Sequence, residues 1–162
     1  IGLLMLVLRY ENAKSETEKR AVFDFYIAHR AAVNNWDLVD VTTPNIVGDF
    51  LSHRKDRKIL VAWARSENLW ERRMAILATF RFIRNGDFRE TLSLATIFIH
   101  DAHDLMHKAT GWMLREVGKR DEIALVCFLE QYATQMPRTM LRYAIEKFPP
   151  KKRQYFLKKT SH

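Results

Sequence analysis

The sequence has few of the residues that make turns and disulfides. Its 162 residues include 5 glycines, 4 prolines and one cysteine. So few glycines and prolines leave little turn chemistry for a sheet protein, and a single cysteine excludes an intramolecular disulfide. Because Cys127 lies in the apolar run 123–129, it is predicted to be a small buried thiol and not a nucleophile. No apolar run approaches the ~20 residues of a membrane span, so no membrane partner is expected.

Acidic residues are also in short supply. The chain has 19 Asp and Glu against 27 Lys and Arg, a formal net charge of +8. A surface this basic indicates an anionic partner, and nucleic acid is the first candidate. A basic protein without such a partner would have the same composition, so charge alone does not decide.

What the sequence does contain is helical periodicity. Hydrophobic residues make up 48% of the chain, which excludes general disorder. Segment 15–18 (S-E-T-E) is a capping box that predicts a helix start. Thr43 and Pro44 are predicted to begin another helix, with Thr43 as its N-cap and Pro44 at its first position. Asn85 and Gly86 are predicted to end a long helix, and 151–159 is expected to be a basic final helix.

The helices are predicted to come in pairs. Trp36, Trp70 and Trp112 recur at spacings of 34 and 42 residues, which fits HEAT-type helix pairs. The expected fold class is therefore all-α, a HEAT-like solenoid of antiparallel helix pairs forming a single domain over residues 1–162. A plain helical bundle would give a similar pattern.

Three segments in order resemble one family. They are 35–40 (N-W-D-L-V-D), 66–77 (S-E-N-L-W-E-R-R-M-A-I-L) and 107–116 (H-K-A-T-G-W-M-L-R-E). Together they resemble the AlkD-type DNA alkylation-repair glycosylases, whose repeats are HEAT-like. Members are usually longer at the N-terminus. Because the apolar segment 1–9 reads as the end of a core helix, the chain is expected to lack N-terminal repeats.

The resemblance implies a site and a reaction. Trp36, Asp40, Arg73 and Trp112 match the family's cleft residues, and the implied substrates are cationic N3- or N7-alkylated purines in double-stranded DNA. An alkylated base is already a good leaving group, so the enzyme has to stabilise a sugar with oxocarbenium character and admit water. The Asp40 carboxylate suits that task, and Trp faces suit a cation. Arg73 would hold a phosphate beside the lesion.

Further DNA contacts are expected on the same segments. Arg72 is the alternative for the phosphate role of Arg73, and Lys108 and Arg115 are candidate phosphate contacts, although a solvated helix face explains each of these two nearly as well. Neither a cofactor nor a metal is expected. The chain is predicted to act as a monomer on alkylated duplex DNA in the cytoplasm.

Three other interpretations stay open. Trp36 could be a core residue and Asp40 a helix cap. The chain could be a non-catalytic HEAT-like binding module, because fold alone does not establish activity. The segment 103–107 (H-D-L-M-H) is similar to the H-E-x-x-H zinc motif, which would suggest a zinc hydrolase, but no third ligand at a useful spacing is evident.

Overall fold

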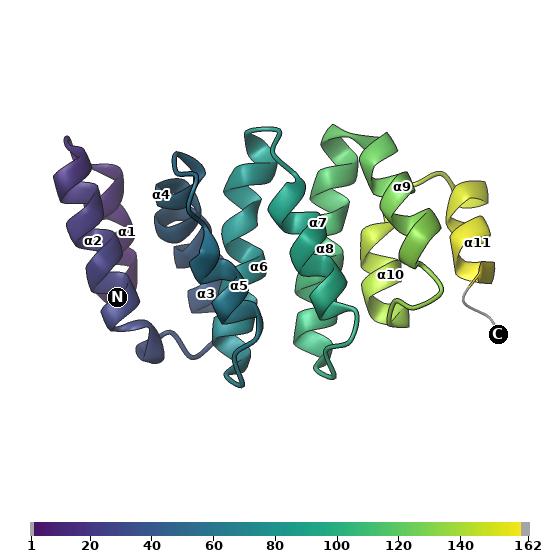
Figure 1. Cartoon of the computed structure of the whole chain (residues 1–162), viewed down its shortest axis with the longest axis horizontal. Helices are drawn as coiled ribbons and strands as arrows, with labels where there is room; N and C mark the ends of the chain where they lie inside the picture. Colours follow the sequence, from purple (N-terminus) through teal and green to yellow (C-terminus); the bar gives the residue numbers. More distant parts are fainter. Residues whose placement is uncertain (1, 160–162) are drawn as a thin grey trace. The chain divides into compact units, whose positions relative to one another are not determined.

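The structure, a computed structural model, describes residues 2–159. These residues contain helices and no strand, so the predicted all-α class is confirmed. They fall into two compact units that meet in sequence between Asn85 and Gly86. Each unit consists of helices joined by short links, which is compatible with a helical-repeat solenoid (Figure 1). A single domain over residues 1–162 stays a prediction.

The first unit contains the first two motif segments. Its elements are α1 (Gly2–Glu11), α2 (Glu16–Ala28), a 3₁₀ turn (Arg30–Ala32), α3 (Trp36–Thr43), a π-helical segment (Pro44–Gly48), α4 (Asp49–Ser52), α5 (Lys58–Ala64) and α6 (Leu69–Arg84). Ser15 Oγ accepts a hydrogen bond from the backbone N of Glu18 at 3.2 Å, so the predicted helix start is confirmed. Gly86, with a φ of 77°, follows the end of α6 as predicted.

A π-helical segment begins at Pro44 as predicted, but the prediction that Thr43 caps a new helix there is wrong. Thr43 has helical torsions (φ −65°, ψ −47°) and its side chain makes no capping hydrogen bond. The chain stays helical through Pro44, because the turn widens into π register. Asp49 N donates to the carbonyl of Pro44, five residues earlier. Pro44 has no N–H for the carbonyl of Asp40, and the wider turn accommodates that loss.

A close helix contact anchors the core of the first unit. A Cβ on Gly48 would lie 2.5 Å from the carbonyl oxygen of Ala78 on α6, so only glycine allows this approach. Around it Ile46, Leu60, Met74 and many other apolar side chains are almost fully buried. Segment 36–52 therefore packs tightly along α6, and this packing fixes the positions of the polar residues on both.

The second unit contains a similar close helix contact. Its helices are α7 (Arg89–Phe98), α8 (Asp104–Arg120), α9 (Glu122–Tyr132), α10 (Arg138–Ala144) and α11 (Pro150–Lys159). A Cβ on Gly111 of α8 would lie 2.5 Å from the carbonyl oxygen of Met140 on α10. In both units, then, a glycine lets one helix pack directly against the backbone of another.

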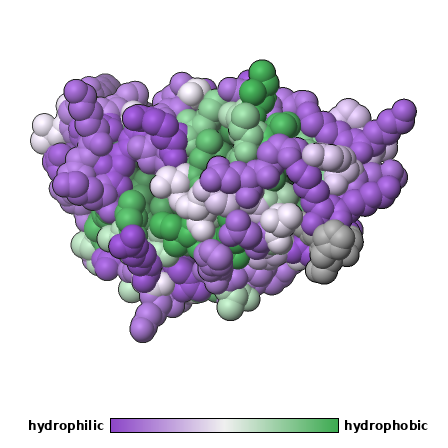
Figure 2. Space-filling model, turned by 45° about the vertical axis from the view of Figure 1, so that its right-hand side comes forward, coloured by the Kyte–Doolittle hydropathy of each residue, from purple (hydrophilic) through white to green (hydrophobic). Residues whose placement is uncertain are grey.

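The prediction for Cys127 is wrong, because its side chain is exposed. The apolar run 123–129 is helical, and a helix of this pitch cannot turn seven consecutive side chains inward. Leu125, Phe128 and Leu129 face the core, whereas Ile123 is 76% exposed. Hydrophobic side chains also reach the surface elsewhere, among many hydrophilic ones (Figure 2). Among residues 2–159 no helix is long and apolar enough to cross a membrane.

Candidate functional site

The first motif segment forms the start of α3. Asn35 is its N-cap, and the side-chain oxygen of Asn35 accepts a hydrogen bond from the backbone N of Asp37 at 3.0 Å. Trp36 is the first residue of the helix and Asp40 follows one turn later, so the two share a face. Trp36 is 54% exposed, which is unusual for a tryptophan with a purely structural role.

Asp40 is held by Arg73 of α6. Nε and Nη2 of Arg73 donate to the two carboxylate oxygens of Asp40, each at 2.8 Å. This is a bidentate pair, in which the planar guanidinium fixes the orientation of the carboxylate. Arg73 is 5% exposed, and the Asp40 side chain keeps 17% of its surface accessible. The carboxylate is therefore oriented from one side and reachable from another.

Several polar residues of the second motif segment shape the entry to α6. Asn68 is the N-cap, and its side-chain oxygen accepts from the backbone N of Trp70 at 2.9 Å. Nη1 of Arg72 donates to the backbone carbonyls of Ser66 and Glu67 at 3.0 and 2.9 Å, so Arg72 holds the loop that leads into the helix. The predicted DNA contact by Arg72 stays a prediction.

The third motif segment lies on α8, in the second unit. Lys108 pairs with Asp104 at 2.8 Å, one turn earlier on the helix. Arg115 pairs with Glu146. Trp112, which lies between Lys108 and Arg115 in the sequence, is half-buried. The spacing of Lys108, Trp112 and Arg115, four residues and then three, places all three on one helix face.

The two histidines of segment 103–107 have other roles. His103 is the N-cap of α8, and its Nδ1 accepts from the backbone N of Leu105 at 3.2 Å. His107 Nε2 lies 2.5 Å from the carbonyl oxygen of Asp101. Among the residues that the structure describes, no three side chains of His, Cys, Asp or Glu are grouped to hold a metal ion. Both rings are therefore engaged with the backbone around the start of α8.

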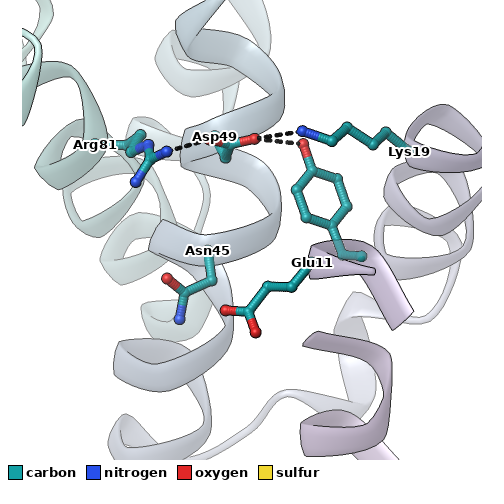
Figure 3. Close-up of a pocket in the computed structure, with 6 residues that line it drawn as sticks. Glu11, Lys19, Asn45, Asp49 and Arg81 are labelled. Atoms are coloured by element: carbon teal, nitrogen blue, oxygen red, sulfur yellow. Dashed lines mark hydrogen bonds and ion pairs between the residues drawn. The ribbon is translucent and has the colours of Figure 1, made fainter. Parts of the chain in front are cut away.

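The sequence analysis missed a second carboxylate of the first unit, which, unlike Asp40, is buried. Asp49, 7% exposed, accepts hydrogen bonds from Tyr10 at 3.0 Å and Lys19 at 3.3 Å and pairs with Arg81 at 2.8 Å (Figure 3). The four residues line a pocket of about 220 Å³ together with Asn45 and Glu11. The sequence does place Arg81 about two turns after Arg73 on one face of a helix. This spacing points to Asp49 as a partner of Arg81 only if the chain stays helical from Asp40 through Pro44 to Asp49.

The environment of Asp49 perturbs two pKa values. Burial raises the pKa of Asp49, but the hydrogen bond from Tyr10 and the charges of Arg81 and Lys19 outweigh burial, so the pKa is lowered overall. Burial, together with the neighbouring Asp49 carboxylate, raises the pKa of Tyr10 well above its ordinary range. Asp49 is therefore a charged group whose hydrogen-bonding capacity is largely used inside the fold.

The fold and the site define an all-helical protein with an oriented, partly accessible carboxylate beside an exposed tryptophan. The family model described as DNA alkylation repair enzyme matches residues 1–148. The chain belongs to this family, which confirms the resemblance seen in the three motif segments. In the same comparisons, no curated protein and no solved structure matched the chain.

Proposed function

We propose that the protein is a DNA glycosylase that hydrolyses the N-glycosidic bond of cationic N3- and N7-alkylated purines in duplex DNA. Membership of the DNA alkylation repair family supports a role in that repair. The observation on which the finer proposal depends is the Asp40 carboxylate, oriented by both donors of Arg73 and 17% accessible, one helical turn from an exposed Trp36. The 162-residue chain acts as a monomeric domain.

The chemistry requires little acid catalysis. An alkylated purine already has a positive charge, so it leaves as a neutral base when it takes the electron pair of its bond to C1′. Positive charge then moves onto the sugar, and water adds to C1′ and loses a proton. A fixed carboxylate stabilises the sugar cation more than the substrate, because the charge near the carboxylate grows as the bond breaks. Asp40 also accepts the proton from water.

The tryptophans and basic residues bind the substrate. The face of Trp36 contacts the cationic base or sugar, which is worth about 0.5–2 kcal/mol. On α8 of the second unit, Trp112 also contacts DNA, and Lys108 and Arg115 contact phosphates on either side of it along the helix. Arg73 orients Asp40, and its predicted phosphate contact stays a prediction.

The test is release of 7-methylguanine and 3-methyladenine from methylated duplex DNA. Asp40→Asn is expected to bind DNA as the wild type does and to release base at least tenfold more slowly, a loss of about 1.4 kcal/mol of transition-state stabilisation. Asp49→Asn is the matched control, because Asp49 lies on the same helical segment and also pairs with an arginine of α6. We expect it to lower stability and leave the excision rate of the folded protein unchanged.

Two outcomes contradict the proposal in different ways. Equal excision by the wild type and Asp40→Asn removes the assigned role of the carboxylate. No excision by the wild type, with DNA still bound, favours the alternative of a non-catalytic HEAT-like binding module.

A further inference from the structure

The final helix is held firmly in the second unit. Phe156 of α11 is 1% exposed. Lys152 and Lys159, two turns apart, form ion pairs with Glu122 and Glu130 of α9. Nη1 of Arg138 donates to the carbonyl of Leu157 near the end of α11 at 2.8 Å. Part of the basic charge of α11 is therefore used to dock the helix.

Another face of α11 borders a groove. Pro150, Arg153, Gln154 and Leu157 have the spacing of one helix face, and they line a cavity of about 460 Å³ whose other wall comes from α10 and the residues after it. That wall consists of Arg142, Ile145 and Glu146. The groove thus has apolar sides and several polar groups, two of them guanidinium groups.

The charge in this groove is positive. Arg142 and Arg153 are both exposed, and within residues 2–159 neither has an ion-pair partner. The acid that also lines the groove, Glu146, is already engaged by Arg115 and, at 3.6 Å, by Lys147. Two unpaired arginines on facing walls are a suitable arrangement for an anion, because each guanidinium offers a planar fork of donors.

The ion pair between Arg115 and Glu146 links this groove to the face of α8 that contains Lys108, Trp112 and Arg115. We propose that the groove between α10 and α11 binds the DNA backbone and extends the DNA-binding surface beyond α8. Arg142 and Arg153 each contact a phosphate there. The inference rests on the proposed function, because it takes the face of α8 as the DNA side of the second unit. The family match ends at residue 148, before α11 begins.

Duplex DNA fits the groove better than an acidic polypeptide does. The chain has an overall charge of +8, and the groove continues a face on which the resemblance already places phosphate contacts. Phosphate contacts do not depend on base identity. The groove should therefore contribute equally to the binding of alkylated and unmodified duplexes.

The experiment measures DNA affinity against salt concentration for the full chain. The double variant Arg142→Gln/Arg153→Gln should reduce the slope of log K against log salt by about 0.9 for each phosphate that the groove no longer neutralises, and weaken binding roughly tenfold per phosphate at 50 mM salt. The weakening should be the same for methylated and unmodified duplexes. Lys151→Gln/Lys158→Gln is the matched control: it removes two exposed charges from α11 that do not line the groove.

The outcomes distinguish failure of the groove proposal from failure of the proposed glycosylase activity. If the wild type excises base and the double arginine variant keeps its affinity and slope, the groove proposal is wrong and the proposed function stands. If the wild type binds without excising and the arginine variant loses affinity, the groove stands and the glycosylase does not. An equal loss of affinity in the lysine control means that charge anywhere on α11 matters, which also overturns the groove. Thermal unfolding establishes that each variant is folded.

Discussion

Replacing Arg73 by lysine tests which of two roles the arginine has. In the structure Nε and Nη2 of Arg73 both donate to Asp40 at 2.8 Å. Lysine keeps the positive charge, but it presents one compact donor group in place of the planar fork, so the carboxylate is no longer held at two points. A phosphate contact, in contrast, depends mainly on charge, which Arg73→Lys preserves.

The size of the effect follows from the burial of the pair. The side chains of Arg73 and Asp40 are 6% and 17% exposed, so water replaces a missing hydrogen bond only in part. Removing one hydrogen bond between charged groups costs about 1.5–3 kcal/mol. For a chain of this size, each kcal/mol lowers Tm by about 2–4 °C. We therefore expect a Tm about 3–12 °C lower. The corresponding loss of about 1.5–3 kcal/mol is smaller than the loss of about 3–5 kcal/mol expected when a buried charge is left without its partner.

The decisive assay compares single-turnover excision with DNA affinity, at a temperature where each variant is folded. If Arg73 positions Asp40, Arg73→Lys slows excision tenfold or more and leaves both Kd and the salt slope unchanged. The control is Arg81→Lys, which alters the equivalent pair with Asp49. It should lower Tm and leave excision unchanged. The reasoning is refuted if Arg73→Lys excises base at the wild-type rate, because a phosphate contact needs only the charge that lysine keeps, whereas holding both oxygens of Asp40 needs the planar fork.

Three further predictions follow from the structure. Trp36→Ala should change the free energy of unfolding by less than about 0.5 kcal/mol, because Trp36 is 54% exposed, yet slow excision about 2- to 30-fold; an unchanged rate counts against contact with the lesion. Gly111→Ala places a Cβ 2.5 Å from a backbone oxygen of α10 and should cost about 1–3 kcal/mol in thermal unfolding, whereas Gly2→Ala, which meets nothing within 4 Å, should not destabilise. Burial and a neighbouring carboxylate raise the pKa of Tyr10, so the unfolded chain loses this proton first and stability falls above about pH 10. The free energy of unfolding of Tyr10→Phe, measured by urea titration, should fall less over the same rise in pH, and a fall identical to that of the wild type contradicts this account.

Local sequence signals predicted most of the helix boundaries. Ser15 caps α2, and Gly86 follows the end of α6, because these residues act on backbone groups a few positions away. The failures have a different cause. Thr43 and Pro44 have the residue types of a helix start, but Tyr26 binds the hydroxyls of Thr42 and Thr43 at 2.8 and 2.9 Å. Tertiary contacts thus hold the chain helical where the local pattern predicts a break.

The candidate site was predictable only as a set of residue types. The motif around Trp36 and Asp40 predicted a helical turn with both residues on one face, and α3 provides it. The partner of Asp40 could not be inferred, because Arg73 lies 33 residues away, and spacing alone does not distinguish a contact with DNA from one with a carboxylate. The resemblance indicated a phosphate, and the folded chain adds an ion pair that orients the carboxylate.

The surroundings of the two carboxylates that face α6 differ, and the difference supports the proposal that Asp40 acts in catalysis while Asp49 stabilises the fold. Asp49 receives donors from Tyr10, Lys19 and Arg81, and only 10% of its side chain is accessible. So many donors stabilise its charge within the fold and leave little of it to act on a substrate. Asp40 is fixed by one arginine through both oxygens and stays more accessible, at 17%. A carboxylate that is rigid and still reachable meets the requirement for stabilising a cation that forms only in the transition state.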